Sequence, residues 1–405
     1  MTTRPGAVDL AVVGAGIVGC AAAFELARGG ASVVVFESNG IGAGASGRNS
    51  GSVQHPFDEV LAPLHRGTVE RYRSLAAETM EGFDFPDAPA GLLLVALEAD
   101  QLALEAERLA VEAIAPELEP RFVAASDLVR LEPMLAPDLA AVRLETAYPI
   151  PPSAAVHAYA ELAIRAGVRF ELDAPVSLEQ RGSSDGRAGR AVVGVRRSDG
   201  TVQPAGAVLV TAGPWTAAIV DPGGEWQPIV RTWGVTVTVR LERPPGHVLE
   251  QAGVASINRP GVPFERDDGG DGGGNQRVGT EPDGHFASTF SLATARGISV
   301  VGSTFLPEEP DAGSLGPLLL HRGDRFVPSL HGLGIEELRV CARPQSLDGR
   351  PLVGRVPGHE NLYIAAGHGP WGISTGPETA GLVADLILGR PVAIPAALDP
   401  ARFGP

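Results

Sequence analysis

Three glycines close to the N-terminus are spaced for a turn that binds phosphate. The turn has the pattern G-x-G-x-x-G and is made of Gly14, Ala15, Gly16, Ile17, Val18 and Gly19. In such a turn the first glycine permits a tight bend, the second lets a pyrophosphate approach the backbone, and the third allows a helix to pack closely against a strand. The N–H groups that begin the helix carry partial positive charge and stabilise the anion. We therefore predict a site for the pyrophosphate of a dinucleotide.

A carboxylate stands where the ribose of that dinucleotide would lie. Glu37, followed by Ser38, ends the next apolar stretch of the chain. A carboxylate at this place can accept hydrogen bonds from both ribose hydroxyls, and it disfavours a 2′-phosphate. Proteins that bind NAD and proteins that bind FAD both use this motif, so it leaves the two cofactors open.

Two further runs of small residues could approach a cofactor closely. The first follows Glu37 and contains Ala45, Ser46, Asn49, Ser50 and Gly51. The second lies near the C-terminus and contains Gly367, His368, Gly369, Gly372, Ile373 and Ser374. Ser374 or Thr375 could cap a helix that has Pro377 in its first turn and runs to about Leu388. A simple NAD-dependent dehydrogenase has no use for a second glycine site, so this run favours FAD.

The elements that must position these residues follow from the hydrophobic pattern. Residues 8–13 and 32–36 are short apolar strands, and residues 17–29 between them form an alanine-rich helix. Such a βαβ unit belongs to a parallel sheet that is covered by helices. Further along the chain we predict helices over 100–114, 154–166 and 377–388, strands over 169–172 and 361–366, two strands around a turn within 191–211, and an antiparallel strand with one buried face at Val235, Val237 and Val239. The glycine- and aspartate-rich residues 266–276 are expected to form a mobile loop.

Composition restricts the class of protein. The chain has 405 residues, enough for two domains, and its 44% of hydrophobic residues is normal for a globular protein. A net charge of −16 argues against nucleic acid and anionic membranes as partners. The two cysteines, Cys20 and Cys341, give no disulfide framework, and no metal site is predicted. The chain shows neither a signal peptide nor an apolar run of about 18 residues, so we expect a cytoplasmic protein without a membrane span.

The basic residues have one unusual property. All 32 of them are arginine, so no lysine is available as a Schiff base, a general base or a cation that activates oxygen. The acidic net charge does not exclude an anionic substrate, because a few buried arginines can create a local positive field.

Together these motifs resemble the D-amino acid oxidase superfamily of flavoproteins, which includes glycine oxidase, sarcosine oxidase and D-amino acid dehydrogenase. The resemblance is strongest over residues 8–52, 205–215 and 340–388. It implies FAD as the cofactor and an α/β fold in which a Rossmann-type FAD-binding domain is interleaved with an α+β substrate-binding domain built on an antiparallel sheet. The implied boundaries are 1–85, 149–221 and 339–405 for the FAD-binding domain, and 86–148 and 222–338 for the substrate-binding domain.

The resemblance also implies how the small-residue runs bind FAD. In that family the first run crosses under the diphosphate and the flavin ring, where Ser46 would reach the cofactor. The second run and the start of the last helix face the flavin N1 and the C2 carbonyl. Val176 resembles the valine whose backbone meets the adenine, and Gly213 resembles the glycine at a strand end near the cofactor.

Residues for the substrate are implied in the same way. Arg343 precedes a proline and stands where glycine oxidase and its relatives clamp the substrate carboxylate with an arginine fork. Trp371 and His55 are expected to border the active site. Pro370 stands where glycine oxidase has a second arginine that contacts the substrate, and this departure disfavours glycine itself.

Cys341 leaves the attachment of the flavin open. In monomeric sarcosine oxidase a cysteine at the matching place is bonded to the flavin, whereas glycine oxidase holds FAD noncovalently. We favour noncovalent FAD, with Cys341 as a small buried residue, and keep a covalent link through Cys341 as the alternative.

The implied reaction is the oxidation of a C–N bond. A small amine that bears a carboxylate, such as a D-amino acid, an N-methyl amino acid or a glycine-like acid, would give a hydride from its α-carbon to flavin N5. Water would hydrolyse the imine, and oxygen or another acceptor would take the electrons. The alternative is oxidation of a 2-hydroxy acid or another alcohol carbon, which needs a base, and His55 and His368 are the evident candidates.

Overall fold

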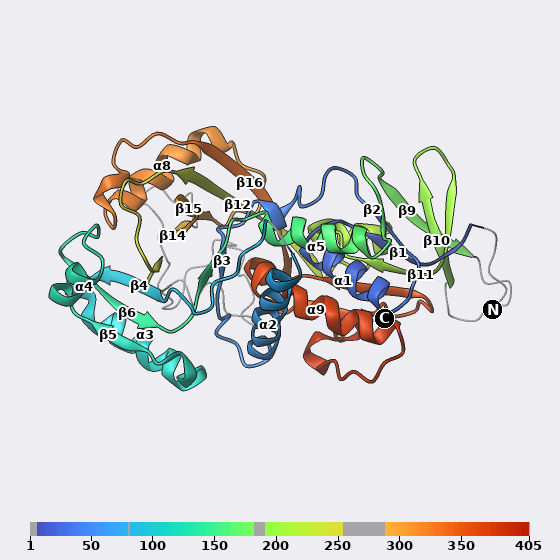
Figure 1. Cartoon of the computed structure of the whole chain (residues 1–405), viewed down its shortest axis with the longest axis horizontal. Helices are drawn as coiled ribbons and strands as arrows, with labels where there is room; N and C mark the ends of the chain where they lie inside the picture. The colour runs from blue at the N-terminus through green and yellow to red at the C-terminus, as the bar shows by residue number, and fades with distance from the viewer. Residues whose placement is uncertain (1–5, 80–81, 182–190, 254–287, 405) are drawn as a thin grey trace.

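The computed structural model describes residues 6–79, 82–181, 191–253 and 288–404. Two large sheets, each accompanied by helices, lie one after the other along the long axis of the molecule (Figure 1). The predicted loop over residues 266–276 lies outside the described residues.

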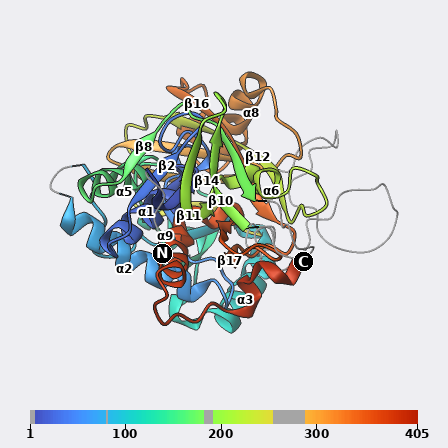
Figure 2. The ribbon, with the colours of Figure 1, turned by 90° about the vertical axis from the view of Figure 1, so that its right-hand side faces the viewer.

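The first sheet contains the predicted βαβ unit. Its strands run in the order β17, β18, β11, β1, β2, β8. β10 pairs with β11, and Figure 2 shows these two strands side by side; β9 pairs with β10. The five strands from β18 to β8 are parallel, and β17 is antiparallel to β18. The bounds are β1 Val8–Val13, β2 Val33–Phe36, β8 Arg169–Glu171, β9 Val176–Arg181, β10 Ala191–Arg197, β11 Val202–Val210, β17 Leu352–Arg355 and β18 Leu362–Ala366.

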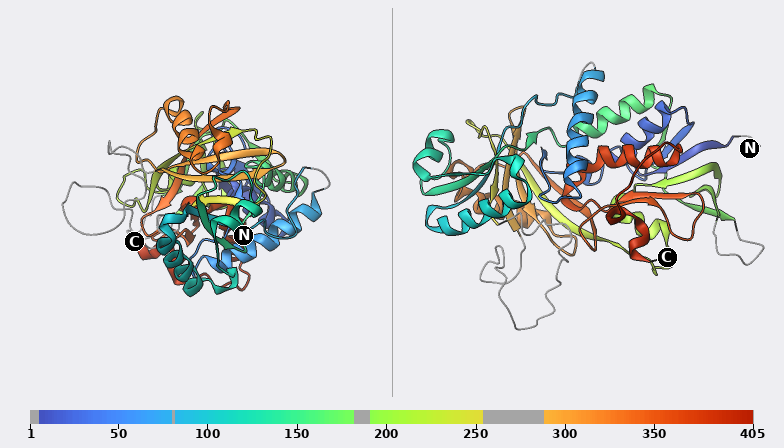
Figure 3. Two further views of the ribbon diagram at one scale, coloured as in Figure 1. Left: turned by 90° about the vertical axis from the view of Figure 1, so that its left-hand side faces the viewer. Right: turned by 90° about the horizontal axis from the view of Figure 1, so that it is seen from below.

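The apolar character of β1 has a direct structural cause. Leu10 and Val12 point into a core formed with the helices, whereas Ala11 and Val13 point into a second core on the opposite face. A parallel strand covered on both faces needs apolar residues at successive positions. Three helices, α1, α5 and α9, lie together on the first of these faces of the sheet (Figure 3), and a fourth, α2, packs against α9. They are α1 Ile17–Arg28, α2 Ala62–Glu78, α5 Ala154–Arg165 and α9 Gly372–Ile387.

The second sheet has the order β16, β12, β15, β14, β13, β4, β6, β5. Neighbouring strands are antiparallel, except that β13 and β4 are parallel. The bounds are β4 Leu92–Leu97, β5 Arg121–Val123, β6 Leu139–Leu144, β12 Ile229–Val239, β13 Val248–Gln251, β14 Ser288–Ala295, β15 Ile298–Thr304 and β16 Glu337–Ser346. The helices of this half are α3 Gln101–Ile114, α4 Ala125–Leu131 and α8 Ala312–Asp324.

Strand β12 departs from its prediction, because both of its faces are buried. Val235, Val237 and Val239 pack into the core under α8, as the alternation predicts. Thr236 and Thr238 are also buried, on the other face. Thr238 accepts a hydrogen bond from Arg339, and Thr236 lines a pocket. A threonine face predicts exposure when it is read alone, but here Arg339 replaces water at Thr238 and the second threonine faces the pocket.

Strand β16 connects the two halves. It pairs with β12 from Glu337 to Ser346, and the next strand, β17, belongs to the first sheet. The boundary at residue 339 that the sequence implies therefore falls within a strand of the second sheet. We propose the five segments given above as the two domains, with β16 as the strand that both share.

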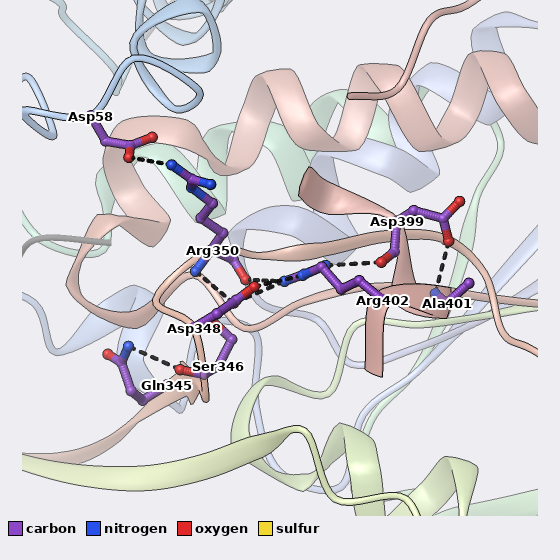
Figure 4. A network of polar contacts seen from close by, with 8 residues as sticks. All are labelled: Asp58, Gln345, Ser346, Asp348, Arg350, Asp399, Ala401 and Arg402. Carbon is purple, nitrogen blue, oxygen red and sulfur yellow. Dashed lines mark hydrogen bonds and ion pairs between the residues drawn. The ribbon is translucent and has the colours of Figure 1, made fainter. Parts of the chain in front are cut away.

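A network of arginines holds the segment after β16 (Figure 4). Arg402, in the last short helix, contacts both carboxylate oxygens of Asp348 at 2.7 and 3.0 Å and donates to the carbonyl of Arg350 at 2.6 Å. Arg350 in turn pairs with the buried Asp58 at 3.0 Å. The C-terminus is thereby tied to the loop that leads from one sheet to the other.

The last helix starts earlier than the sequence predicts. Helix α9 begins at Gly372, after a short turn over residues 369–371, so Ser374 and Thr375 lie inside it and do not cap it. Pro377 lies in the interior, where it cannot donate a hydrogen bond to the carbonyl of Ile373. The hydroxyl of Tyr72 donates to that carbonyl at 2.8 Å instead. Tyr72 therefore satisfies the group that the proline leaves without a backbone partner.

None of the described helices is long and apolar enough to cross a membrane.

Candidate active site

One pocket of about 890 Å³ extends from the first sheet to the second. It begins beside the carboxyl end of β2, passes the start of α1 and the start of α9, and ends over β12–β16. Most of the residues predicted from the sequence line it, namely Gly14, Gly16, Ile17, Val18, Glu37, Ser38, Ala45, Ser46, Asn49, Ser50, Val176, Gly213, Cys341, Arg343, His368, Gly369, Trp371, Gly372, Ile373 and Ser374. The predicted residues that do not line it are Ala15, Gly19, Gly51, Gly367 and His55.

The phosphate-binding turn is built on close backbone contacts. Gly14 has a φ of +107°, and a side chain on it would lie 2.7 Å from the carbonyl oxygen of Thr211. A side chain on Gly19 would collide with the carbonyl oxygen of Gly14. The Thr211 hydroxyl donates to the carbonyls of Val13 and Gly14 and holds β1 against β11 at this point. Gly19 is thus required for packing, which explains why it lies outside the pocket.

Two side chains complete the turn. Glu37 accepts hydrogen bonds from the backbone N–H of Ala15 at 2.8 Å and of Asn39 at 3.0 Å. These donors fix the carboxylate at the pocket wall, at the place where a ribose would meet it. The hydroxyl of Ser46 accepts from the N–H of Ile17 at 2.9 Å, at the start of α1. A dinucleotide pyrophosphate would therefore meet both the helix N-terminus and Ser46.

The second glycine run reaches the middle of the pocket. Gly369 has a φ of +55°, and a side chain there would lie 2.5 Å from the amide oxygen of Gln345. Trp371 is buried and ends the turn that precedes α9. His368 is buried with its Nε2 at 3.2 Å from the Thr379 hydroxyl, and burial lowers the pKa of His368 to about 4. This ring is therefore neutral at physiological pH.

His55 is placed differently from the prediction. It is buried, but it does not line the pocket. Its Nδ1 accepts the N–H of Phe57 at 3.1 Å, and its ring lies edge-on to His65 at 5.5 Å. Burial lowers the pKa of His55 to about 4 and that of His65 to about 3. The structure places both imidazoles in a packing cluster, with Glu117 3.8 Å from His55 Nε2.

Arg343 lies in the part of the pocket formed by the second sheet. Its Nη1 donates to the carbonyl of Thr304 at 2.8 Å, and its Nη2 donates to the hydroxyl of Ser303. The guanidinium carbon lies 4.6 Å from the centre of the Phe305 ring. Among the described residues no carboxylate pairs with it, and burial lowers the pKa of Arg343 without removing its charge at neutral pH.

A glycine makes room for this guanidinium. Gly234, on β12, pairs with Cys341 on β16, and a side chain on Gly234 would lie within 2.5 Å of the Arg343 Cζ. The guanidinium of Arg343 therefore lies against the bare backbone of β12. This requirement was not visible in the sequence, because Gly234 belongs to no motif.

Cys341 lies at the pocket wall near the small-residue run. Its Sγ is 3.9 Å from the carbonyl oxygen of Arg48, and burial raises the pKa of its thiol. A thiol of this kind is a poor nucleophile, because the reactive form is the thiolate. Within the described ranges, no group of three or more metal-ligating side chains is arranged to hold a metal ion.

Several polar residues of the pocket escaped the prediction. Arg48 lies on the wall and donates to the carbonyl of Val340 at 2.8 Å. The end of the pocket over the second sheet is lined by Gln54, Glu250, Ser291 and Ser303. They belong to the second sheet or to the segment after Ser50, where no motif marks them. Only strand pairing brings them together.

The pyrophosphate turn, the carboxylate for the ribose and the elongated pocket beyond them define an oxidoreductase that uses a dinucleotide cofactor. The chain belongs to the DAO family of FAD-dependent oxidoreductases, whose family model matches residues 9–386. FAD is accordingly its cofactor, and the enzyme is an FAD-dependent amino acid oxidase or dehydrogenase, as the sequence predicted.

Individual relatives cover nearly the whole chain. The glycine oxidase of Bacillus licheniformis is 24% identical over 396 residues, which is 95% of this chain and 94% of that protein. The glycine oxidase of Geobacillus kaustophilus is 28% identical over 396 residues, which is 94% of this chain and 92% of that protein. The crystal structure of iminodiacetate oxidase from Chelativorans sp. BNC1 matches with a TM-score of 0.75 and 25% identity, covering 96% of this chain and 98% of that one. The predicted fold, a Rossmann-type half with a second substrate half, is confirmed.

The residues present fit FAD. The pocket runs continuously from Glu37 past Ser46 to Ser374, so one elongated cofactor could contact all three. Glu37 would hold the ribose, the start of α1 would hold the pyrophosphate, and the start of α9 would face the flavin ring.

Proposed function

We propose that the enzyme oxidises the C–N bond of a small amino or imino acid by removing a hydride from the α-carbon. The observation that carries this proposal is Arg343, a cation on the pocket floor whose described partners are a carbonyl, a hydroxyl and an aromatic ring. A guanidinium in this setting has an unmet preference for an anion, and its fork matches the two oxygens of a carboxylate.

The chemistry divides between the cofactor and the chain. When FAD is bound, its flavin supplies the acceptor for the hydride. The chain's own residues position the substrate, because Arg343 would hold the carboxylate at one end of the pocket and Trp371 would border the reacting carbon. The imine that results is released to water, where hydrolysis gives an oxo acid and an amine or ammonia.

The relatives support an amine as the substrate, because they are oxidases of glycine and of iminodiacetate. Glycine itself is a weaker candidate for this chain. Pro370 lines the pocket where the sequence resemblance places a second arginine in glycine oxidase. We therefore propose a substrate larger than glycine, either a D-amino acid or a secondary amine such as an N-substituted glycine.

Anaerobic bleaching of the bound flavin tests the proposal. The purified holoenzyme is mixed with D-alanine, sarcosine, iminodiacetate, glycine, D-lactate and glycolate, and the flavin absorbance is followed. We expect at least one of the amines to bleach the flavin and the two hydroxy acids to leave it oxidised. Bleaching by a hydroxy acid with no response to any amine would replace this proposal by the alcohol-oxidising alternative.

Three finer points complete the proposal. FAD is bound noncovalently, since burial raises the pKa of the Cys341 thiol, and acid precipitation should leave a colourless pellet with all FAD in the supernatant. Oxygen or another acceptor takes the electrons from the reduced enzyme, and peroxide formed in air identifies oxygen. The enzyme acts in the cytoplasm, and cell fractionation tests this location.

A further inference from the structure

Glu250 brings a negative charge to the same pocket that holds Arg343. It lies on β13 and lines the pocket, and its carboxylate accepts a hydrogen bond from the Nε2 of Gln54 at 2.9 Å. Among the described residues no arginine or histidine pairs with it. A carboxyl group with one neutral donor, facing a ligand pocket, is available to a ligand.

The two charges lie at different places on one sheet face. Glu250 is directly opposite Ser291 on β14, which is opposite Gly302 on β15, which is opposite Thr236 on β12. The guanidinium of Arg343 reaches across β12 to the residues of β15 that follow Gly302. Glu250 and the end of Arg343 are thus about two strand spacings apart, roughly 10 Å between backbones. A small amino acid can bridge such a gap, with its carboxylate on Arg343 and its nitrogen toward Glu250.

Glu250 is also connected to the cofactor side of the pocket. The amide of Gln54 that donates to Glu250 is oriented by the hydroxyl of Ser52, which donates to its oxygen at 3.1 Å. The backbone N–H of Gln54 donates to the hydroxyl of Ser374 at 3.0 Å, in the first turn of α9. Through Gln54, the carboxyl is therefore linked to the start of α9, the segment that would face the flavin.

We propose that Glu250 is the base that takes a proton from the substrate ammonium group before hydride transfer. This inference rests on the proposed function. Glu250 gains the proton and becomes a neutral acid, and the nitrogen gains a lone pair. The α-C–H bond then breaks, its hydrogen leaves with both electrons to the bound oxidised flavin, and the lone pair forms the C=N bond. Glu250 returns its proton to water when the product leaves.

The surroundings of Glu250 suit this role. Burial and the nearby Glu107 of α3 raise the pKa of Glu250 to about 7, and the hydrogen bond from Gln54 offsets part of the shift. The other charged groups around it are Arg343 across the pocket, Glu309 in the lining of the same pocket, and Arg322 of α8, which donates to the neighbouring Gln251 at 3.0 Å. A base whose pKa lies near the working pH is effective in proton transfer.

The test is the pH dependence of flavin reduction in the holoenzyme. Wild type and Glu250→Gln are reduced anaerobically by iminodiacetate, sarcosine or D-alanine, whichever bleaches the wild-type flavin. In the wild-type enzyme, the rate constant for flavin reduction at low substrate concentration should decrease as the pH is lowered through about 7. In Glu250→Gln the pH at which this rate constant decreases should move up to the pKa of the free substrate ammonium, because only the neutral amine can then react. With that pKa about two to three units higher, the variant should be about 100- to 1,000-fold slower near pH 7 and should approach the wild-type rate only above about pH 10.

Controls separate this role from a structural one. Glu337→Gln removes a carboxylate from the same sheet at an exposed place outside the pocket, and it should keep the wild-type profile. An equal loss of rate at every pH in Glu250→Gln would mean that the carboxyl only supports the pocket, and an unchanged profile would exclude it as the base. Both outcomes would overturn the inference and leave the proposed function intact. Failure of every amine to bleach the wild-type flavin would instead overturn the proposed function.

Discussion

The two halves of the molecule are built to bind their ligands by different means. The cofactor end of the pocket is made of backbone, in turns where Gly14, Gly16 and Gly369 leave no side chain in the way. The substrate end, where we propose that the amine binds, is made of side chains such as Arg343 and Glu250, which project from separate strands of one sheet. A binding site made of backbone needs glycines within a few consecutive residues, so its pattern is visible in a sequence. A side-chain site needs only one residue from each strand and leaves no local pattern.

The largest effect should follow from breaking the cofactor end alone. In Gly19→Ala the added methyl group collides with the carbonyl of Gly14, which is backbone and cannot move aside. We expect the turn to open and the purified protein to contain little or no flavin. The measurement is the ratio of flavin to protein absorbance. Gly40→Ala is the matched control, because Gly40 has open space around it, and this variant should keep its FAD.

Breaking the substrate end alone should give a different phenotype. Arg343→Met removes the guanidinium and keeps most of the volume, so FAD should stay bound while the apparent KM for the amine rises. Loss of a charge-assisted hydrogen-bonded pair costs about 3 kcal/mol, which corresponds to roughly a 100-fold rise. Steady-state kinetics and the flavin spectrum are measured together. Arg355→Met, on an arginine that lies over the Tyr363 ring outside the pocket, should leave KM unchanged. An unaltered KM in Arg343→Met would contradict its role as the clamp.

The junction of the two halves should make the protein sensitive to acid. His55 and His65 lie there beside Glu117, and burial lowers the pKa of both rings below the usual value near 6.5. The unfolded chain then binds more protons than the folded one below about pH 6.5, so stability falls as the pH falls toward 4. At pH 5 each ring should lower the free energy of unfolding by about 2 kcal/mol.

Thermal melts of the holoenzyme at pH 7 and pH 5 measure this effect. The decrease in Tm from pH 7 to pH 5 should be smaller for His65→Leu than for wild type. His157→Gln, on an exposed face of α5, should behave as wild type. Parallel losses in wild type and His65→Leu would show that this histidine does not set the acid sensitivity.

A substitution with a smaller expected effect would sharpen the comparison. It tests a position in the substrate half where, as in the cofactor half, a glycine is needed because a side chain would not fit. In Gly234→Ala the new methyl group meets the guanidinium of Arg343, the far end of a side chain that can move. The protein should therefore fold and bind FAD, with KM raised about tenfold, the equivalent of about 1.4 kcal/mol. If KM stays at the wild-type value, the contact of Arg343 with β12 has no part in binding.

The fold was predictable where local pattern decides it. The unit β1, α1 and β2 matches its predicted residues within one position at each end, because both strands are apolar and glycines bound the helix. The start of α9 was not predictable, since the carbonyl of Ile373, which Pro377 leaves without a backbone donor, is satisfied by Tyr72, distant in sequence. The two buried faces of β12 were missed for a similar reason, as Thr238 is satisfied by Arg339 from the neighbouring strand.

The candidate site divides in the same way. Residues around Gly14 and Glu37 could be predicted from spacing and Arg343 from family resemblance, whereas His55 was expected near the substrate and lies in a packing cluster. The position of Glu250 in the pocket could not have been predicted, because it depends on the register with which β13 pairs with β14. Register between strands far apart in sequence is set by tertiary packing and turn geometry.

The order of strands in the first sheet has a consequence for how the protein is made. β1 leaves the ribosome well before its neighbour β11, because Val13 and Thr211 are 198 positions apart in the chain. β11 in turn waits for β18, which ends at Ala366. Pairings of such long range fold slowly and leave sheet edges open until they form. The nascent chain must therefore carry an unfinished nucleotide-binding sheet until β18 has been made, and the complete flavin site can form only after that point.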